Sequence, residues 1–170
     1  MKRILCLLMA LCLLLPVAAM AEGTAKIGVA YGACHSHGVA VATVVVVDGV
    51  IVDAKIDEIY FTNANDAYVV LPNAEEIAVV DETAVVAISK RQNDEVYSAN
   101  MVARGGQSVA TSYDGIQAFV IGKTVAELEA AVEGFSADNK AEFVDVVSGS
   151  TLVDTLSYTL VLLEAARNAQ

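Results

Sequence analysis

The chain has 170 residues, of which 56% are hydrophobic and 18% charged, and its formal net charge is −11. This length is enough for one domain with a sizeable core. The acidic balance disfavours nucleic acid and anionic membrane surfaces as partners, and it favours basic partners or cations.

The first 21 residues have the pattern of a cleavable secretory signal peptide. Lys2 and Arg3 precede an apolar run, which ends at the small-residue site Ala19-Met20-Ala21. Pro16 interrupts the run, which is shorter than a typical membrane span. We therefore expect a secreted or cell-envelope protein without a stable membrane anchor after cleavage, whose single domain spans residues 22–170 with a net charge of −13.

Two β-branched runs, at about residues 39–47 and 50–59, predict a β-hairpin, because they meet at the turn-forming pair Asp48-Gly49. The unbroken run from Val44 to Val47 predicts a central strand covered on both faces. Residues 24–31 predict another strand. Residues 76–88 predict one or two more, with a turn at Asp81-Glu82.

From Ser108 onward the apolar spacing becomes helical. Ile116, Phe119 and Val120 share one face of a first helix that ends at Gly122, and Thr124 with Glu127 forms a capping box for a second. A last helix is expected from about Ser150 to Ala166, with Leu152, Leu156, Leu160 and Leu163 on its packed face and Asp154, Ser157, Glu164 and Arg167 elsewhere. These elements predict an α+β domain with a small antiparallel sheet and a central hairpin, covered by C-terminal helices.

The segment DVVSGST, Asp145 to Thr151, directly precedes this expected last helix. A helix N-terminus offers free N–H groups and a positive dipole end to an anion such as phosphate. Gly149 permits close approach of a bulky group, and Ser148, Ser150 and Thr151 add hydroxyls. On spacing alone, an ordinary helix cap accounts for the same residues.

The segment resembles the flavinylation motif of bacterial FMN-binding domains: Asp, two variable residues, Ser-Gly, a small residue and Thr. In that family an exported flavin transferase uses FAD and magnesium to join FMN to the final Thr through a phosphodiester. The resemblance implies that Asp145, Ser148, Gly149 and Ser150 are motif residues and that Thr151 carries covalent FMN. Ser150 stands where Ala is commoner in the family.

Three further blocks are similar to the same domains in extracellular electron-transfer flavoproteins of Gram-positive bacteria: VVVVDGVIVDAKID, SKRQNDEVYSANM and YDGIQAFVIGKTVAELE. The resemblance implies an exported flavoprotein that relays electrons from a membrane quinol or flavin-reducing partner to an extracellular acceptor. No catalytic triad or carboxylate dyad is evident. An electron carrier is therefore expected rather than a substrate-converting enzyme.

Several assignments stay open. The aromatic candidates beside a flavin are Tyr31, Tyr60, Phe61 and Tyr97, and Arg104-Gly105-Gly106 forms either a phosphate contact or a solvated turn. Cys34, His35 and His37 form a metal site, line a redox pocket or lie in a polar loop. With two of the three cysteines in the signal segment, Cys34 has no internal disulfide partner. Alternative functions are a cofactor-free exported binding or envelope module, a metal-binding protein and a noncovalent FMN reductase.

Overall fold

The computed structural model describes residues 23–35, 37–73 and 85–170. Four antiparallel strands form one sheet in chain order: β1 (Ala25–Gly32), β2 (Gly38–Val47), β3 (Val50–Asn63) and β4 (Val85–Ser89). Helices follow the sheet and pack on it, so the expected α+β class, with a hairpin at its centre, is confirmed. The expected signal peptide and the turn at Asp81-Glu82 lie outside the described residues.

The predicted hairpin is confirmed by its turn. Asp48 and Gly49 both have positive φ, 51° and 80°, which is the requirement of a type I′ turn. The pairing of β2 with β3 shifts register at Val45 and Val46, next to this turn.

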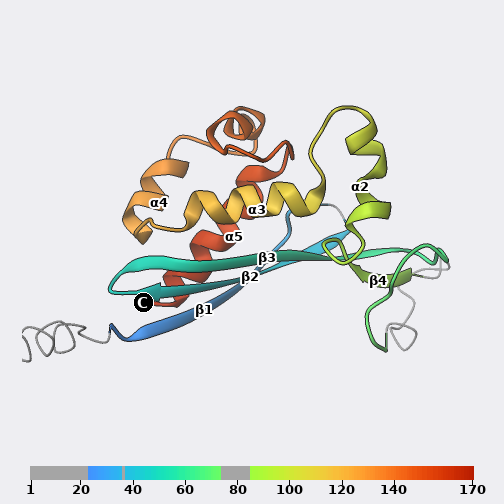
Figure 1. The fold of residues 1–170 in the computed structure, drawn as a ribbon. Helices are drawn as coiled ribbons and strands as arrows, with labels where there is room; N and C mark the ends of the chain where they lie inside the picture. Colours follow the sequence, from blue (N-terminus) through green and yellow to red (C-terminus); the bar gives the residue numbers. More distant parts are fainter. Residues whose placement is uncertain (1–22, 36, 74–84) are drawn as a thin grey trace, which may run out of the picture.

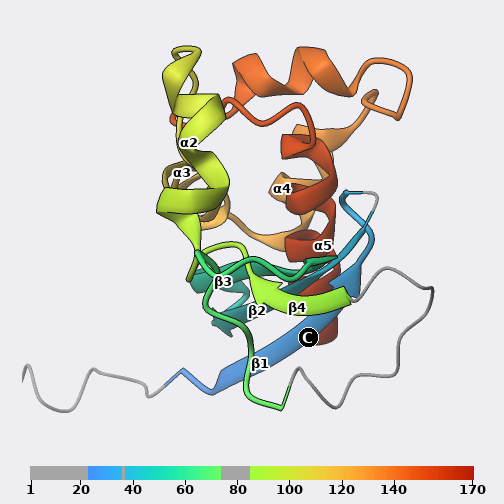
Figure 2. The same ribbon diagram turned by 90° about the vertical axis from the view of Figure 1, so that its right-hand side faces the viewer.

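The helical part comprises α2 (Asp94–Ala103), α3 (Val109–Val120), α4 (Val125–Val132), the 3-10 helix η2 (Lys140–Val146) and α5 (Thr155–Asn168). Both ribbon views show these helices gathered over one face of the sheet (Figures 1 and 2). α5 contacts β1, β2 and β3, and α3 lies over β3.

The expectation that β2 is covered on both faces is wrong. Ala40, Ala42, Val44 and Val46 are buried against the helices, whereas the alternate residues are only half-buried or exposed. The continuous valine run reflects a preference for β-branched residues on a pleated surface, not a second layer of helices. On the open face, the side chains of Ile27 and Tyr31 in β1 remain 67% and 70% exposed.

The boundaries of α3 and α4 follow their predicted signals. Gly122 has φ of 86° just beyond α3. Thr124 and Glu127 form the predicted capping box at the start of α4, because each side chain accepts a hydrogen bond from the other's backbone N–H. These local signals required no tertiary information.

The last helix differs from its prediction. It begins at Thr155, not near Ser150, and ends at Asn168. Leu156 and Leu163 are buried as expected, but Leu160 is 43% exposed and Leu152 lies before the helix. The packed face also includes Tyr158, Leu162 and the small residues Ala165 and Ala166, and α5 lies close against β1 there.

Candidate functional site

The motif residues span the end of η2 and the loop between η2 and α5. Asp145 is exposed near the end of η2, Ser148 and Gly149 form an exposed turn, Ser150 is buried and Thr151 is exposed. Because α5 starts four residues after Thr151, this hydroxyl is not at a helix N-terminus, and the expected helix-dipole anion site is wrong. The expectation of an ordinary cap at Ser150 or Thr151 is wrong for the same reason.

Local hydroxyl bonds explain the late start of α5. Oγ of Ser150 lies 2.8 Å from Oγ1 of Thr155, and Thr155 also donates to the carbonyl of Leu152. Serine and threonine side chains that bond nearby groups in this way compete with helix formation. The N-cap position falls to Asp154, whose side chain makes no capping hydrogen bond.

The turn after α2 holds the Thr151 hydroxyl. The backbone N–H of Gln107 donates a 2.8 Å hydrogen bond to Oγ1 of Thr151. A Cβ on Gly106 would lie 3.5 Å from this oxygen, an ordinary contact, and 3.2 Å from the carbonyl oxygen of Met101, which is tight. Of the segment Arg104-Gly105-Gly106, Gly106 therefore lies beside the motif hydroxyl, whereas Arg104 is exposed.

A second backbone contact seats the motif loop on α3. A Cβ on Gly115 would lie 2.7 Å from the carbonyl carbon of Gly149 and 3.0 Å from the carbonyl oxygen of Ser148. Only a residue without a side chain permits this approach. The loop thus rests directly on the helix.

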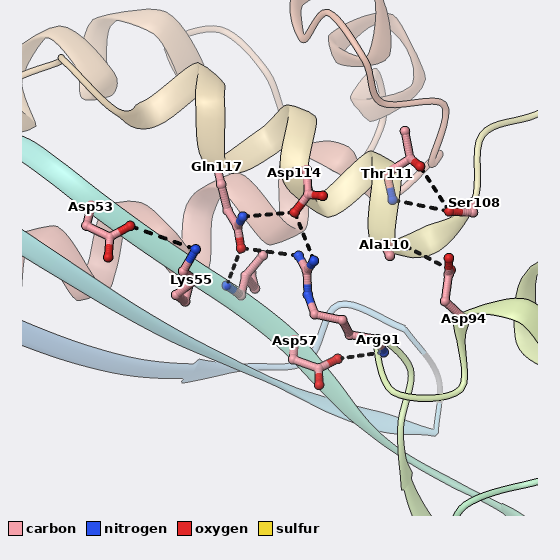
Figure 3. Close-up of polar contacts among 11 residues, drawn as sticks. Asp53, Lys55, Asp57, Arg91, Asp94, Ser108, Ala110, Thr111, Asp114 and Gln117 are labelled. Atoms are coloured by element: carbon pink, nitrogen blue, oxygen red, sulfur yellow. Dashed lines mark hydrogen bonds and ion pairs between the residues drawn. The ribbon is translucent and has the colours of Figure 1, made fainter.

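The start of α3 is tied to α2 by polar contacts (Figure 3). Asp94 accepts hydrogen bonds from the N–H of Ala110 at 2.9 Å and from the hydroxyl of Ser98 at 2.7 Å. Ser108 caps α3 by accepting from the N–H of Thr111. These contacts hold the start of α3, directly after Gln107, against α2.

Thr151 lines a pocket of about 290 Å³ between α2, α5 and the 151–154 loop. The other lining side chains include His35, Lys90, Tyr97, Met101 and Tyr158. A second hollow of about 500 Å³ adjoins it, sharing His35, Val153 and Asp154 and adding Cys34, Gly38 and Lys140.

A buried ion pair lies at the base of the first pocket. Nζ of Lys90 is 2.7 Å from Oε2 of Glu58, and the side chains are 3% and 0% exposed. Tyr158 donates its hydroxyl to the same oxygen. Oε1 of Glu58 has no hydrogen-bond partner among the described residues. Burial, with the neighbouring Tyr113 and the bond to Glu58, raises the pKa of Tyr158, so its hydroxyl stays protonated.

Aromatic rings surround Lys90. Its ammonium lies 4.9 Å from the ring centroid of Tyr60 and 4.8 Å from that of Tyr97, and the two rings are 5.5 Å apart. Cation–π contacts at these distances are stabilising. The candidates Tyr60 and Tyr97 are thus brought together, while Tyr31 and Phe61 are exposed on other parts of the sheet.

The three residues Cys34, His35 and His37 differ in how deeply they are buried. Cys34 is buried, and burial together with the charge of Glu58 raises the pKa of its thiol to about 12. The rings of His35 and His37 pack against Tyr60 at 5.9 Å and 6.4 Å between centroids. Within the described parts of the chain, no three His, Cys, Asp or Glu side chains are grouped to hold a metal ion.

Glu58, Lys90 and Tyr158 were missed as site residues in the sequence. One signal was available: Glu58 continues the inward-facing period of Ala54 and Ile56 in β3, where a charged residue is unusual. In the sequence, Lys90 belongs to a short basic run that is typical of a solvated surface. Nothing in the sequence therefore marks it as a site residue.

Comparisons of the chain with known protein families, with curated proteins and with solved structures gave no match. No helix among residues 23–35, 37–73 and 85–170 combines the length and apolarity required to cross a bilayer.

Proposed function

We propose that this protein is an exported electron carrier whose FMN is joined to Oγ1 of Thr151 through a phosphodiester. The observation that carries the proposal is the position of Thr151. The acceptor residue of the flavinylation-like motif is exposed and also lines a pocket with Tyr97 and Lys90. A hydroxyl in such a position is accessible to a modifying enzyme while the attached group has a cavity beside it.

The pocket residues fit a flavin in kind. Small-molecule sites are typically cavities of roughly 300–1,000 Å³ lined by apolar and aromatic groups with a few placed polar ones. The pocket and its adjoining hollow, about 290 and 500 Å³, combine Tyr97, Met101 and Leu152 with the polar groups of Lys90 and His35. Oε1 of Glu58, which has no hydrogen-bond partner within the described part of the chain, marks a buried polar cluster behind them.

The turn beside Thr151 fits a phosphate link. Gly106 presents backbone without a side chain next to Oγ1, and the N–H of Gln107 points at it. The proposed attachment forms one bond, from Oγ1 to the FMN phosphorus of FAD. It breaks the pyrophosphate bond, so that AMP leaves and the hydroxyl proton is released.

The attached flavin would supply reversible transfer of one or two electrons, and the protein would position the ring and adjust its potential. Electron transfer between cofactors requires no general acid, base or nucleophile from the chain. Tyr60 and Tyr97 would shield the site from water, and Lys90 would supply its positive charge. A membrane quinol or flavin-reducing partner and an extracellular acceptor are the proposed partners, with a flavin transferase required for maturation.

The test is intact-mass measurement of the full chain expressed for export with a bacterial flavin transferase. The expected product is heavier than the bare mature chain by FMN less one water, and peptide mapping should place that mass on Thr151. Thr151→Ala should remove the addition. The matched control Thr111→Ala, which deletes another hydroxyl near this end of the molecule, should retain it.

Two results would contradict the proposal. Export of an unmodified chain beside an active transferase would favour a cofactor-free envelope module. Retention of the covalent flavin in the Thr151→Ala variant would exclude Thr151 as the attachment point.

A further inference from the structure

Lys90 places a buried positive charge at the pocket that contains the motif hydroxyl. It is the only Lys or Arg among the described residues lining this cavity. Glu58, its partner at 2.7 Å, is fully buried and does not line the cavity. The ion pair is therefore oriented, with the cation at the cavity wall and the carboxylate behind it.

One carboxylate oxygen of the ion pair lacks a hydrogen-bond donor among the described residues. Buried carboxylates in stable ion pairs normally have donors on both oxygens, because an unpaired buried oxygen keeps its desolvation cost. Tyr158 and Lys90 both donate to Oε2, whereas Oε1 has no donor among the described residues. A role in packing alone does not account for this geometry, since apolar residues often replace such pairs without loss.

We infer that Lys90 raises the reduction potential of the attached flavin by stabilising the negative charge that the ring gains on reduction, with Glu58 and Tyr158 as positioning residues. The inference rests on the proposed function. Two electrons from a reduced quinone and one proton from solvent leave a bound flavin with one added negative charge. A cation in a cavity of low dielectric favours that charged form, and no bond to Lys90 is made or broken.

The two members of the pair have opposite expected effects. Glu58→Gln removes the anion and keeps the cation, so the potential should rise. Replacing both, in Glu58→Gln with Lys90→Gln, removes the charge nearer to the cavity as well as the one behind it, so the potential should fall below that of the wild type. At a fixed applied potential, the expected change in the ratio of reduced to oxidised protein is at least tenfold, about 30 mV for two electrons.

The measurement is spectroelectrochemistry on full-length, flavin-loaded proteins. Dithionite is the reductant, and redox mediators equilibrate the flavin with the electrode. Arg91→Gln is the matched control, because it deletes a positive charge from the neighbouring residue. Arg91 reaches away from the pocket to Asp114 at 2.8 Å and Gln117 at 3.2 Å (Figure 3), and its variant should keep the wild-type potential. The apolar pair Glu58→Leu with Lys90→Met replaces the double glutamine variant should the latter fail to fold, with the same expected fall.

These potentials are compared only in protein whose mass proves flavin attachment. The role of Lys90 would be overturned if the potentials were unchanged. It would also be overturned if the single and double variants shifted the potential in the same direction. A wild-type chain that lacks the flavin mass beside an active transferase would overturn the proposed function as well. The two failures are therefore distinguishable in the same samples.

Discussion

The backbone N–H of Gln107 and Oγ1 of Thr151 are joined by a 2.8 Å hydrogen bond, which ties the motif loop to the turn between α2 and α3. The hydroxyl oxygen accepts, so its own proton remains free to be released. This contact gives Thr151 a conformational role that is separate from any role in attachment.

Thr151→Ala should lower the free energy of unfolding of the unmodified protein by about 0.5–1.5 kcal/mol, the usual contribution of one hydrogen bond. Thr151→Ser should stay close to the wild type, because it keeps the acceptor for Gln107. Urea denaturation of protein made without a transferase measures both. Equal losses in the two variants would show that the methyl group, not the hydrogen bond, stabilises the loop.

Lys90→Met should destabilise the protein strongly, by about 3–5 kcal/mol, because it leaves the carboxylate of Glu58 buried without a cation. Adding Glu58→Leu should recover most of that loss, since the buried charge is then gone. Denaturation of the wild type, both single variants and the double variant completes the cycle. Losses that simply add would contradict a coupled pair.

The thiol of Cys34 should resist alkylation in the folded protein. Burial is the main reason that its pKa rises from 9.0 to about 12, which lowers the thiolate fraction by roughly a thousandfold at pH 8. Iodoacetamide labelling followed by mass spectrometry should be at least about a hundredfold slower in buffer than in urea. The proton is held more tightly when folded, so stability should be fully present below pH 9 and decline as pH rises toward 12.

Rapid native labelling at pH 8 would instead indicate that the hollow beside His35 opens to solvent. A Cys34→Ala variant is the control for the pH effect, because it should lose the decline assigned to this thiol.

Asp94 should contribute stability that is lost in acid. Burial alone would raise its pKa, but hydrogen bonds from Ala110, Ser98 and Ser108 outweigh burial and hold the pKa below its ordinary value of 3.8. The contribution should be present above pH 3.8 and disappear as pH falls through the lowered pKa. At neutral pH, Asp94→Asn should cost about 1 kcal/mol, a value reduced for solvent exposure.

Denaturation profiles of the wild type and of Asp94→Asn across acidic pH provide the check. The wild type should lose more stability than the variant as pH falls. Parallel profiles would remove Asp94 from the account of acid sensitivity.

The elements predicted best from the sequence are those with local causes. Asp48-Gly49 suits one turn type, and the capping box of Thr124 and Glu127 requires only the residues of one helix turn. The start of α5 was misplaced because the hydroxyls of Ser150 and Thr155 bond each other, which no apolar period reveals. α2 was not predicted, because its valines Val96 and Val102 remain 40% and 52% exposed and give no clear stripe.

The candidate site was predictable in part for a similar reason. The motif at Asp145–Thr151 is contiguous, so the sequence alone draws attention to it. Glu58 and Lys90 are brought together by the pairing of β3 with β4, where the N–H of Lys90 also donates to the carbonyl of Glu58. Their joint burial depends on the helices above the sheet, so the sequence pattern alone does not predict it.

The bare backbone of Gly115 beneath the turn at Ser148 and Gly149 makes α3 part of the motif. The conformation of the seven-residue motif therefore depends on the absence of a side chain at Gly115, a residue of another helix. Even alanine at position 115 should require this loop to be rebuilt, because its Cβ would lie 2.7 Å from the backbone of Gly149.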